Sequence, residues 1–167
     1  MRALKHIHGM NIMHRDIKPT NIRVSANNNL VLLDFGSAIT NNISNNADKG
    51  TYLYMSRKRS NSKWYGLEED LVGAGVTLFQ LYMDDPTLYP WRIPTSEHPD
   101  GSRFDRITPD DMTLGVFLSM LNPKCSKFVA QNIYGMIFPE SGQKTYDDIN
   151  YHMFEPVGET FLNLRVL

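Results

Sequence analysis

The sequence has one cysteine, almost no net charge and no long hydrophobic run. Cys125 is the only cysteine, so no internal disulfide can form, which fits a reducing compartment. The formal net charge of −1 gives no reason to expect a nucleic acid or an anionic membrane as partner. The longest mostly apolar stretch, Leu71 to Met83, is too short to span a bilayer, and the N-terminus lacks the apolar segment of a secretory signal. We therefore expect an intracellular protein, cytoplasmic or nuclear.

The composition is that of a globular domain. Of the 167 residues, 41% are hydrophobic and 21% are charged. A chain of this length can bury roughly 70% of the surface that it exposes when unfolded. The histidines form no metal-ligand spacing with Cys125, so they predict no metal site of their own.

Two short polar motifs carry the chemical signal. The first is His14-Arg15-Asp16-Ile17-Lys18-Pro19-Thr20-Asn21, and the second is Asp34-Phe35-Gly36. They match the patterns H-R-D-L-x-x-x-N and D-F-G, with isoleucine in place of leucine. Each motif alone could arise by chance, as an exposed polar loop and an unrelated turn. Both in this order, joined by a strand-turn-strand pattern, are a specific signal for phosphoryl transfer.

From about Met1 to about Phe154 the chain resembles the large, C-terminal lobe of eukaryotic-type serine/threonine protein kinases, and residues 155–167 would form a tail. The resemblance implies a mainly α fold with a short β-hairpin that carries the catalytic and D-F-G segments. The short apolar runs 22–24 and 30–33 would pair in this hairpin, since the asparagines between them tolerate turn geometry. Lys18 and the Gly50-Thr51 segment favour the serine/threonine class.

The resemblance also implies a role for each polar side chain of the two motifs. Asp16 would orient the substrate hydroxyl, and Lys18 would lie near the transferred phosphate. Asn21 and Asp34 would hold Mg²⁺ against ATP, and the acceptor would be a protein serine or threonine. The implied catalytic set is therefore Asp16, Lys18 and Asn21, and the implied cofactor-binding set is Lys18, Asn21, Arg23 and Asp34, with Asn21 and Asp34 as metal ligands.

Arg23 departs from the family pattern, which has an apolar residue beneath the adenine at this position. Two interpretations follow. The alkyl part of the Arg23 side chain could lie under the base with its guanidinium in water. Alternatively, adenine binds poorly here. The sequence leaves both open.

A second departure concerns an ion pair of the family. Where the family has A-P-E, this chain has Ser56-Arg57-Lys58, and Gln143 lies where the partner arginine is expected. Loss of one partner of a buried pair would cost about 3–5 kcal/mol, whereas loss of both can be nearly neutral. The joint loss predicts a divergent but self-consistent domain.

The sequence also lacks the small-lobe motifs of the family: the glycine-rich loop, the V-A-I-K lysine strand and the helix with its glutamate. We therefore expect little or no activity from this chain alone. A small lobe or a partner chain would cover the cleft, and the sequence would be either a fragment or a protein with half of the usual ATP site. The alternative function is an inactive, kinase-derived binding or scaffold module.

The segment Ser37 to Lys49 is polar, so we expect it not to pack. Phosphate on one of its hydroxyls could pair with Arg15, although an unregulated loop is the alternative. Asp70 begins an apolar helix, where it would cap the helix or place a favourable charge at its N-terminus, and the resemblance implies that it also anchors the backbone near His14 and Arg15. The candidate phosphosites are Ser37, Thr40 and Ser44, and helices are predicted for 3–8, ending at Gly9, and for 70–81, 112–121, 128–137 and 146–154.

Overall fold

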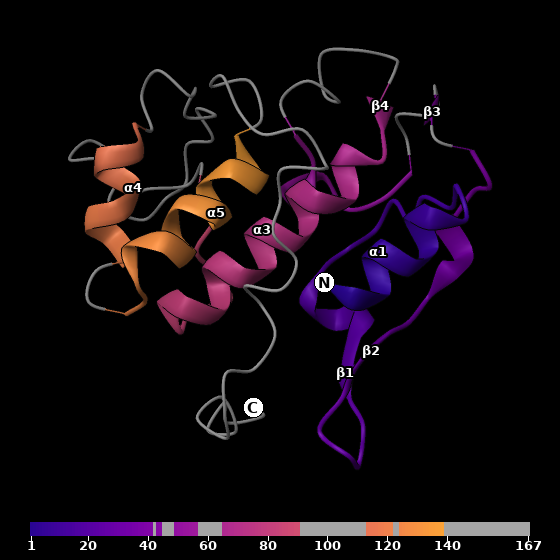
Figure 1. Ribbon diagram of the computed structural model, residues 1–167, viewed down its shortest axis with the longest axis horizontal. Coiled ribbons are helices and arrows are strands. Elements are labelled where there is room, and N and C mark those ends of the chain that lie inside the picture. Colours follow the sequence, from indigo (N-terminus) through magenta and orange to yellow (C-terminus); the bar gives the residue numbers. More distant parts are fainter. Residues whose placement is uncertain (42, 45–48, 57–64, 91–112, 122–123, 139–167) are drawn as a thin grey trace.

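The computed structural model describes residues 1–41, 43–44, 49–56, 65–90, 113–121 and 124–138 (Figure 1). Within these ranges the fold is mainly helical, with two small antiparallel sheets. The helices are α1 (Arg2–Gly9), α3 (Glu68–Met83), α4 (Leu114–Leu121) and α5 (Lys127–Ile137). The strands are β1 (Ile22–Val24), β2 (Leu30–Leu32), β3 (Ile43–Ser44) and β4 (Tyr65–Gly66).

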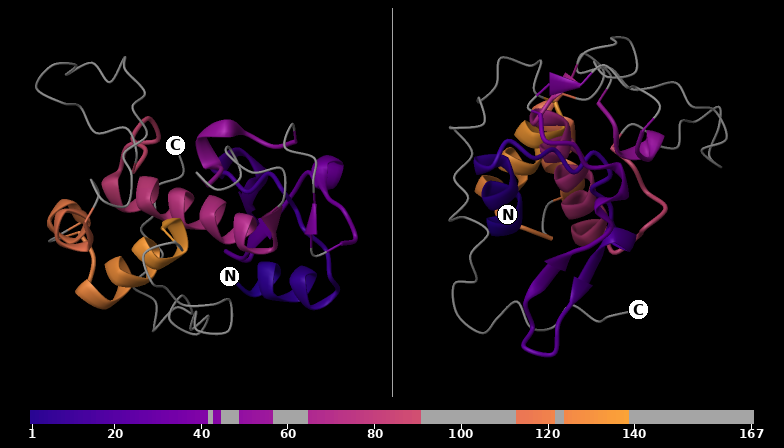
Figure 2. Two further views of the ribbon diagram at one scale, coloured as in Figure 1. Left: turned by 90° about the horizontal axis from the view of Figure 1, so that it is seen from above. Right: turned by 90° about the vertical axis from the view of Figure 1, so that its right-hand side faces the viewer.

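Helix α3 is the central element of the fold. The left view of Figure 2 shows α5 (orange) and α1 (indigo) lying along different parts of α3. It shares one apolar core with α4 and α5. It shares a second core with α1 and the loop of the first motif, residues 14–21, which is named the catalytic loop below after the role that the resemblance implies. The first core includes Val76, Phe79, Phe117 and Ile133, and the second includes Leu4, Ile7, Ile17, Leu71 and Ala74. Burial on both sides explains why the sequence of α3 is apolar nearly all round.

Two glycines allow close packing on α3. A Cβ atom on Gly73 would lie 2.7 Å from the carbonyl oxygen of Ile17. A Cβ atom on Gly75 would lie 2.8 Å from a side-chain carbon of Ile137. The α3 backbone therefore rests directly against the catalytic loop at one point and against α5 at the next.

The β1–β2 hairpin projects away from the helices (Figure 1). Ile22 pairs with Leu32, and Val24 pairs with Leu30. The turn is closed by a hydrogen bond from the Asn29 N–H to Ser25 Oγ at 3.1 Å, and Asn28 takes a left-handed conformation. Because β1 directly follows Asn21 and β2 ends at Leu32, just before Asp34, the hairpin brings the two sequence motifs to its base.

One prediction from the sequence is wrong in part. The polar segment from Ser37 packs at two places among its described residues: Ile39 and Met13 exchange backbone hydrogen bonds of 3.0 Å, and Ser44 is buried in the pairing of β3 with β4. Backbone pairing substitutes for the missing apolar side chains. The predicted end of the first helix at Gly9 is confirmed, since α1 runs from Arg2 to Gly9, and Asn11, two residues further on, takes a positive φ of 56°.

The remaining helix predictions fit where they can be compared. Helix α3 begins two residues before the predicted start and ends two residues after the predicted end, and α4 and α5 lie within one or two residues of their predicted limits. The predicted helix 146–154, the tail, Arg57, Lys58 and Gln143 lie outside the described residues. In the part of the chain that the structure describes, no helix is both long and apolar enough to cross a membrane.

Candidate active site

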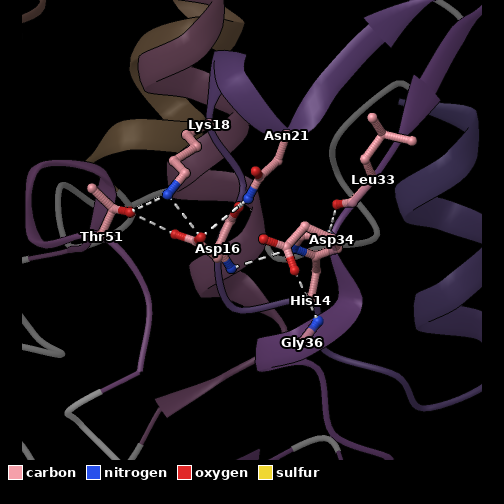
Figure 3. A network of polar contacts seen from close by, with 8 residues as sticks. All are labelled: His14, Asp16, Lys18, Asn21, Leu33, Asp34, Gly36 and Thr51. Carbon is pink, nitrogen blue, oxygen red and sulfur yellow. Dashed lines mark hydrogen bonds and ion pairs between the residues drawn. The ribbon is translucent and has the colours of Figure 1, made fainter.

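The carboxylate of Asp16 is the centre of a compact polar cluster (Figure 3). Its Oδ1 accepts a hydrogen bond of 2.7 Å from the Thr51 hydroxyl. Its Oδ2 accepts one of 3.0 Å from the Asn21 amide and pairs with Lys18 Nζ at 2.9 Å. The Lys18 Nζ also donates to Thr51 Oγ1 at 2.7 Å. The structure thus brings together three side chains of the first motif and Thr51, which is distant in sequence.

Gly50 makes the approach of Thr51 possible. Its φ is +100°, and a Cβ atom at this position would lie 2.2 Å from the carbonyl oxygen of Arg15. Only glycine combines this conformation with this contact. Gly50 and Thr51 are therefore part of the site, although they lie outside both sequence motifs.

The surroundings of Asp16 set its charge. Burial by itself raises the pKa of the Asp16 carboxyl. Hydrogen bonds from Lys18, Thr51 and Asn21, with the positive charge of Lys18, outweigh burial and hold the pKa below its usual value. Asp16 is therefore an anion near neutral pH, able to accept a hydrogen bond from a hydroxyl group.

Asn21 and Asp34 supply oxygen ligands at the base of the hairpin. The Asn21 amide nitrogen donates to the Asp16 carbonyl at 2.8 Å as well as to its carboxylate, which leaves the amide oxygen for another ligand. Asp34 is exposed, with a left-handed φ of 58°, and only its Oδ1 accepts from the Gly36 N–H, at 3.2 Å. Two hard oxygen ligands fit Mg²⁺ that is also held by phosphates. Among the described residues, no group of three or more His, Cys, Asp or Glu side chains could hold a metal ion by itself.

His14 joins the two motifs. The fully buried ring donates from Nε2 to the Leu33 carbonyl at 2.9 Å and accepts the Asp16 N–H at Nδ1, at 3.3 Å. Its edge also meets the Phe35 ring, with centroids 4.8 Å apart. His14 is the first residue of the first motif, but the motif by itself predicts no separate role for it.

Asp70 anchors the catalytic loop to α3. Its carboxylate accepts the backbone N–H groups of His14 and Arg15, both at 2.7 Å, and lies 2.8 Å from His8 Nε2. The expected anchor is therefore confirmed. The expected helix cap is wrong, because Leu67 occupies the cap position, but Asp70 does lie in the first turn of α3, where the helix dipole favours its negative charge.

Arg15 binds three uncharged acceptors. Its guanidinium donates to the Ser37 carbonyl, to Ser44 Oγ at 3.2 Å and to Tyr65 Oη at 3.4 Å. The residue is only 7% exposed. Of the three candidate phosphosites, Ser44 is thus the one whose hydroxyl already contacts Arg15. Tyr65 was not predicted as a partner of Arg15, because no sequence motif around Tyr65 indicates this contact.

Arg23 lies outside the polar cluster. It is exposed on β1, opposite Val31 of β2. The structure therefore brings together Asp16, Lys18 and Asn21, places Asp34 beside them through the hairpin and His14, and leaves Arg23 apart on the strand.

Several kinases are similar in sequence. The chain is 38% identical over 92 residues to serine/threonine-protein kinase TIO of Arabidopsis thaliana, which covers 53% of this chain and 7% of the relative. It is 34% identical over 87 residues to the probable cAMP-dependent protein kinase catalytic subunit of Encephalitozoon cuniculi, covering 52% and 27%. With the Aurora kinase of Saccharomyces cerevisiae it shares 34% over 114 residues, covering 67% and 29%. The chain thus spans less than a third of each relative.

A family model agrees with these similarities. The model described as protein kinase domain matches residues 1–128, which is more than half of the chain. The match includes both motifs, Thr51 and the whole of α3. The chain therefore belongs to the protein kinase domain family.

Proposed function

We propose that residues 1–154 form the large lobe of a protein serine/threonine kinase domain, which transfers the γ-phosphate of ATP to protein hydroxyl groups when a small lobe completes the cleft. The observation that carries the proposal is the cluster in which Asp16, Lys18 and Asn21 meet Thr51. One of the related proteins named above is a serine/threonine-protein kinase, and this supports the same class of acceptor.

The side chains divide the work of phosphoryl transfer. The substrate hydroxyl donates to the ionised Asp16, which orients its oxygen toward the γ-phosphorus of ATP. A new P–O bond forms to that oxygen while the bond from the γ-phosphorus to the ADP oxygen breaks, and the hydroxyl proton leaves toward Asp16. Lys18, close to Asp16, neutralises charge on the transferred group.

The Asn21 amide oxygen and the Asp34 carboxylate would hold Mg²⁺ in this proposal. The ion, when bound, offsets the negative charge of the phosphates. Asn21 has a second task, because its amide nitrogen holds the Asp16 carboxylate from the side opposite Thr51. We favour an enzyme over a binding module because this network is intact.

The test compares two substitutions in residues 1–167 joined to the small lobe of a related kinase. Asp16→Asn should lower kcat by about 100-fold or more and leave nucleotide affinity nearly unchanged. Asp34→Asn should weaken Mg²⁺-dependent nucleotide binding as well. Residues 1–167 without a small lobe should fall well below the usual turnover of about 1–100 s⁻¹.

The exposed Asp84 provides a matched control, since Asp84→Asn makes the same chemical change far from the cluster. Radiometric turnover and nucleotide titration report the two properties separately. Near-normal turnover of Asp16→Asn would contradict the assignment of the catalytic loop and would favour the binding module instead.

A further inference from the structure

Glu69 is a buried carboxylate that the proposed function does not use. It lies in the first turn of α3, directly before Asp70, and is 5% exposed. Its Oε2 accepts the Ser56 N–H at 3.1 Å, and its Oε1 accepts the Ser56 hydroxyl hydrogen. Ser56 is equally buried, at 5% exposure. Both hydrogen-bond donors of Ser56, its backbone N–H and its hydroxyl, thus bind a single carboxylate.

Ser56 ends the described segment 49–56, and this segment carries Thr51. Near its other end, Gly50 lies against the carbonyl oxygen of Arg15. The segment is therefore held at two points, by the catalytic loop at Gly50 and by α3 at Ser56. Thr51, which contacts Asp16 and Lys18, lies between these points.

Asp70, the next residue of α3, holds the catalytic loop as Glu69 holds residues 49–56. Asp70 holds the backbone N–H groups of His14 and Arg15, and Glu69 holds the segment that faces them. Hydrogen bonds to a carboxylate are stronger than those between neutral groups, and the N-terminal turn of a helix favours negative charge. The first turn of α3 therefore holds both the catalytic loop and the segment 49–56.

The sequence supports a specific pairing. At Ser56 the resemblance allows alanine or serine, of which only serine has a hydroxyl to donate, and this chain lacks the glutamate of the A-P-E pattern because Lys58 occupies its place. The carboxylate that holds the end of this segment comes instead from α3.

We propose that Glu69 is a positioning residue that, through Ser56, keeps Thr51 in contact with Asp16 and Lys18. It touches none of the reacting groups. Its importance for turnover rests on the proposed function, whereas the placement of Thr51 can be measured without any enzymatic activity.

The experiment measures amide hydrogen exchange and the Thr51 methyl resonance by NMR in residues 1–167. Glu69→Gln keeps the size of the side chain and removes its charge. Loss of a hydrogen bond to a charged group should speed exchange at Ser56 about 10- to 100-fold. The Thr51 methyl signal should shift, and its nuclear Overhauser effect to the Lys18 side chain should weaken.

Two further variants separate positioning from general stability. Ser56→Ala, which keeps the backbone bond to Glu69, should give a smaller change in the same direction, and Ser56→Thr should restore the wild-type Thr51 signal. Glu68→Gln removes a charge from the same turn, where Glu68 contacts the Gly66 N–H rather than Ser56. It should leave residues 50–56 unchanged.

Each outcome decides the proposal. Unchanged exchange at Ser56 in Glu69→Gln, or an unmoved Thr51 signal in both Glu69→Gln and Ser56→Ala, would overturn it. Exchange that rises equally in α5 and in residues 50–56 would also overturn it, because Glu69 would then only stabilise the fold. A shifted Thr51 signal in a protein that shows no turnover even with a small lobe would leave the positioning role standing and reject the proposed function.

Discussion

At the scale of single residues, the carboxyl groups of Asp16 and Asp70 are chemically the same but bind different hydrogen-bond donors. Asp16 is partly exposed and shares its oxygens among Thr51, Asn21 and Lys18, which suits a group that must exchange one partner for a substrate. Asp70 is 2% exposed and binds two backbone N–H groups and His8, none of which a substrate would displace. The first arrangement suits chemistry, and the second suits support.

Asp70→Asn should therefore destabilise the fold strongly. The amide puts a donor against one of the backbone N–H groups of His14 and Arg15 and removes the charge that faces His8. Breaking such a buried set should cost about 3–5 kcal/mol of unfolding free energy. Urea denaturation followed by circular dichroism measures the loss. Asp84→Asn is the control: Asp84 is the exposed, left-handed C-cap residue of α3, so asparagine there should leave stability unchanged or raise it slightly. A loss below about 1 kcal/mol for Asp70→Asn would contradict the anchor role.

The sequence predicted the polar residues that lie within continuous motifs. Asp16, Lys18, Asn21 and Asp34 stand out because their spacing along the chain matches a pattern for phosphoryl transfer, and their roles stay predictions. Glu69 and Tyr65 were not found, because their partners, Ser56 and Arg15, are defined only by tertiary packing. A single glutamate or tyrosine near a helix start has no local signature that distinguishes a buried partner from a solvated side chain.

At the scale of elements, α3 organises the molecule, and its position was predictable to within two residues at each end. A long, nearly continuous apolar stretch can only be a buried element, so its existence followed from sequence. The two-residue strands β3 and β4 were not predictable, since a period of two cannot be read from two residues. Their pairing is decided by the Arg15 side chain and by the chain path around it.

Gly73 and Gly9 should respond to alanine in opposite directions. Gly73→Ala places a methyl group against Ile17 of the catalytic loop and should cost about 1–3 kcal/mol, despite the better helix propensity of alanine. Gly9 lies in α1 with no atom within 4 Å of an added Cβ, so Gly9→Ala should add about 0.4–1 kcal/mol. Thermal unfolding of both variants checks the signs. Equal stabilisation by both would mean that α3 does not press on the catalytic loop.

At the scale of the whole molecule, five of the eleven exposed large hydrophobic side chains among the described residues lie on the β1–β2 hairpin and the segment after it. Leu30 is 67% exposed, which is the largest exposed fraction of any large hydrophobic side chain in the described part of the chain. A surface of this kind favours association with another apolar surface. The members of this group are Val24, Leu30, Val31, Leu33 and Phe35.

Residues 1–167 should therefore self-associate through the hairpin and bind hydrophobic dyes. The double variant Val24→Thr with Leu30→Gln should reduce both the mass measured by light scattering and the dye fluorescence. Leu81→Gln, at an exposed position on α3, is the control and should change neither. A monodisperse wild-type monomer without dye binding, or an equal effect of Leu81→Gln, would count against this role of the hairpin.

The adjacent carboxylates Glu69 and Asp70 have a consequence for protein engineering. Because one helical turn holds both the catalytic loop and the segment that faces it, neither can be transplanted to another scaffold as an independent module. A donor sequence for residues 14–16 or 51–56 must bring a compatible pair at positions 69 and 70. Libraries that vary these three regions together should yield functional chimeras more often than libraries that vary one region at a time.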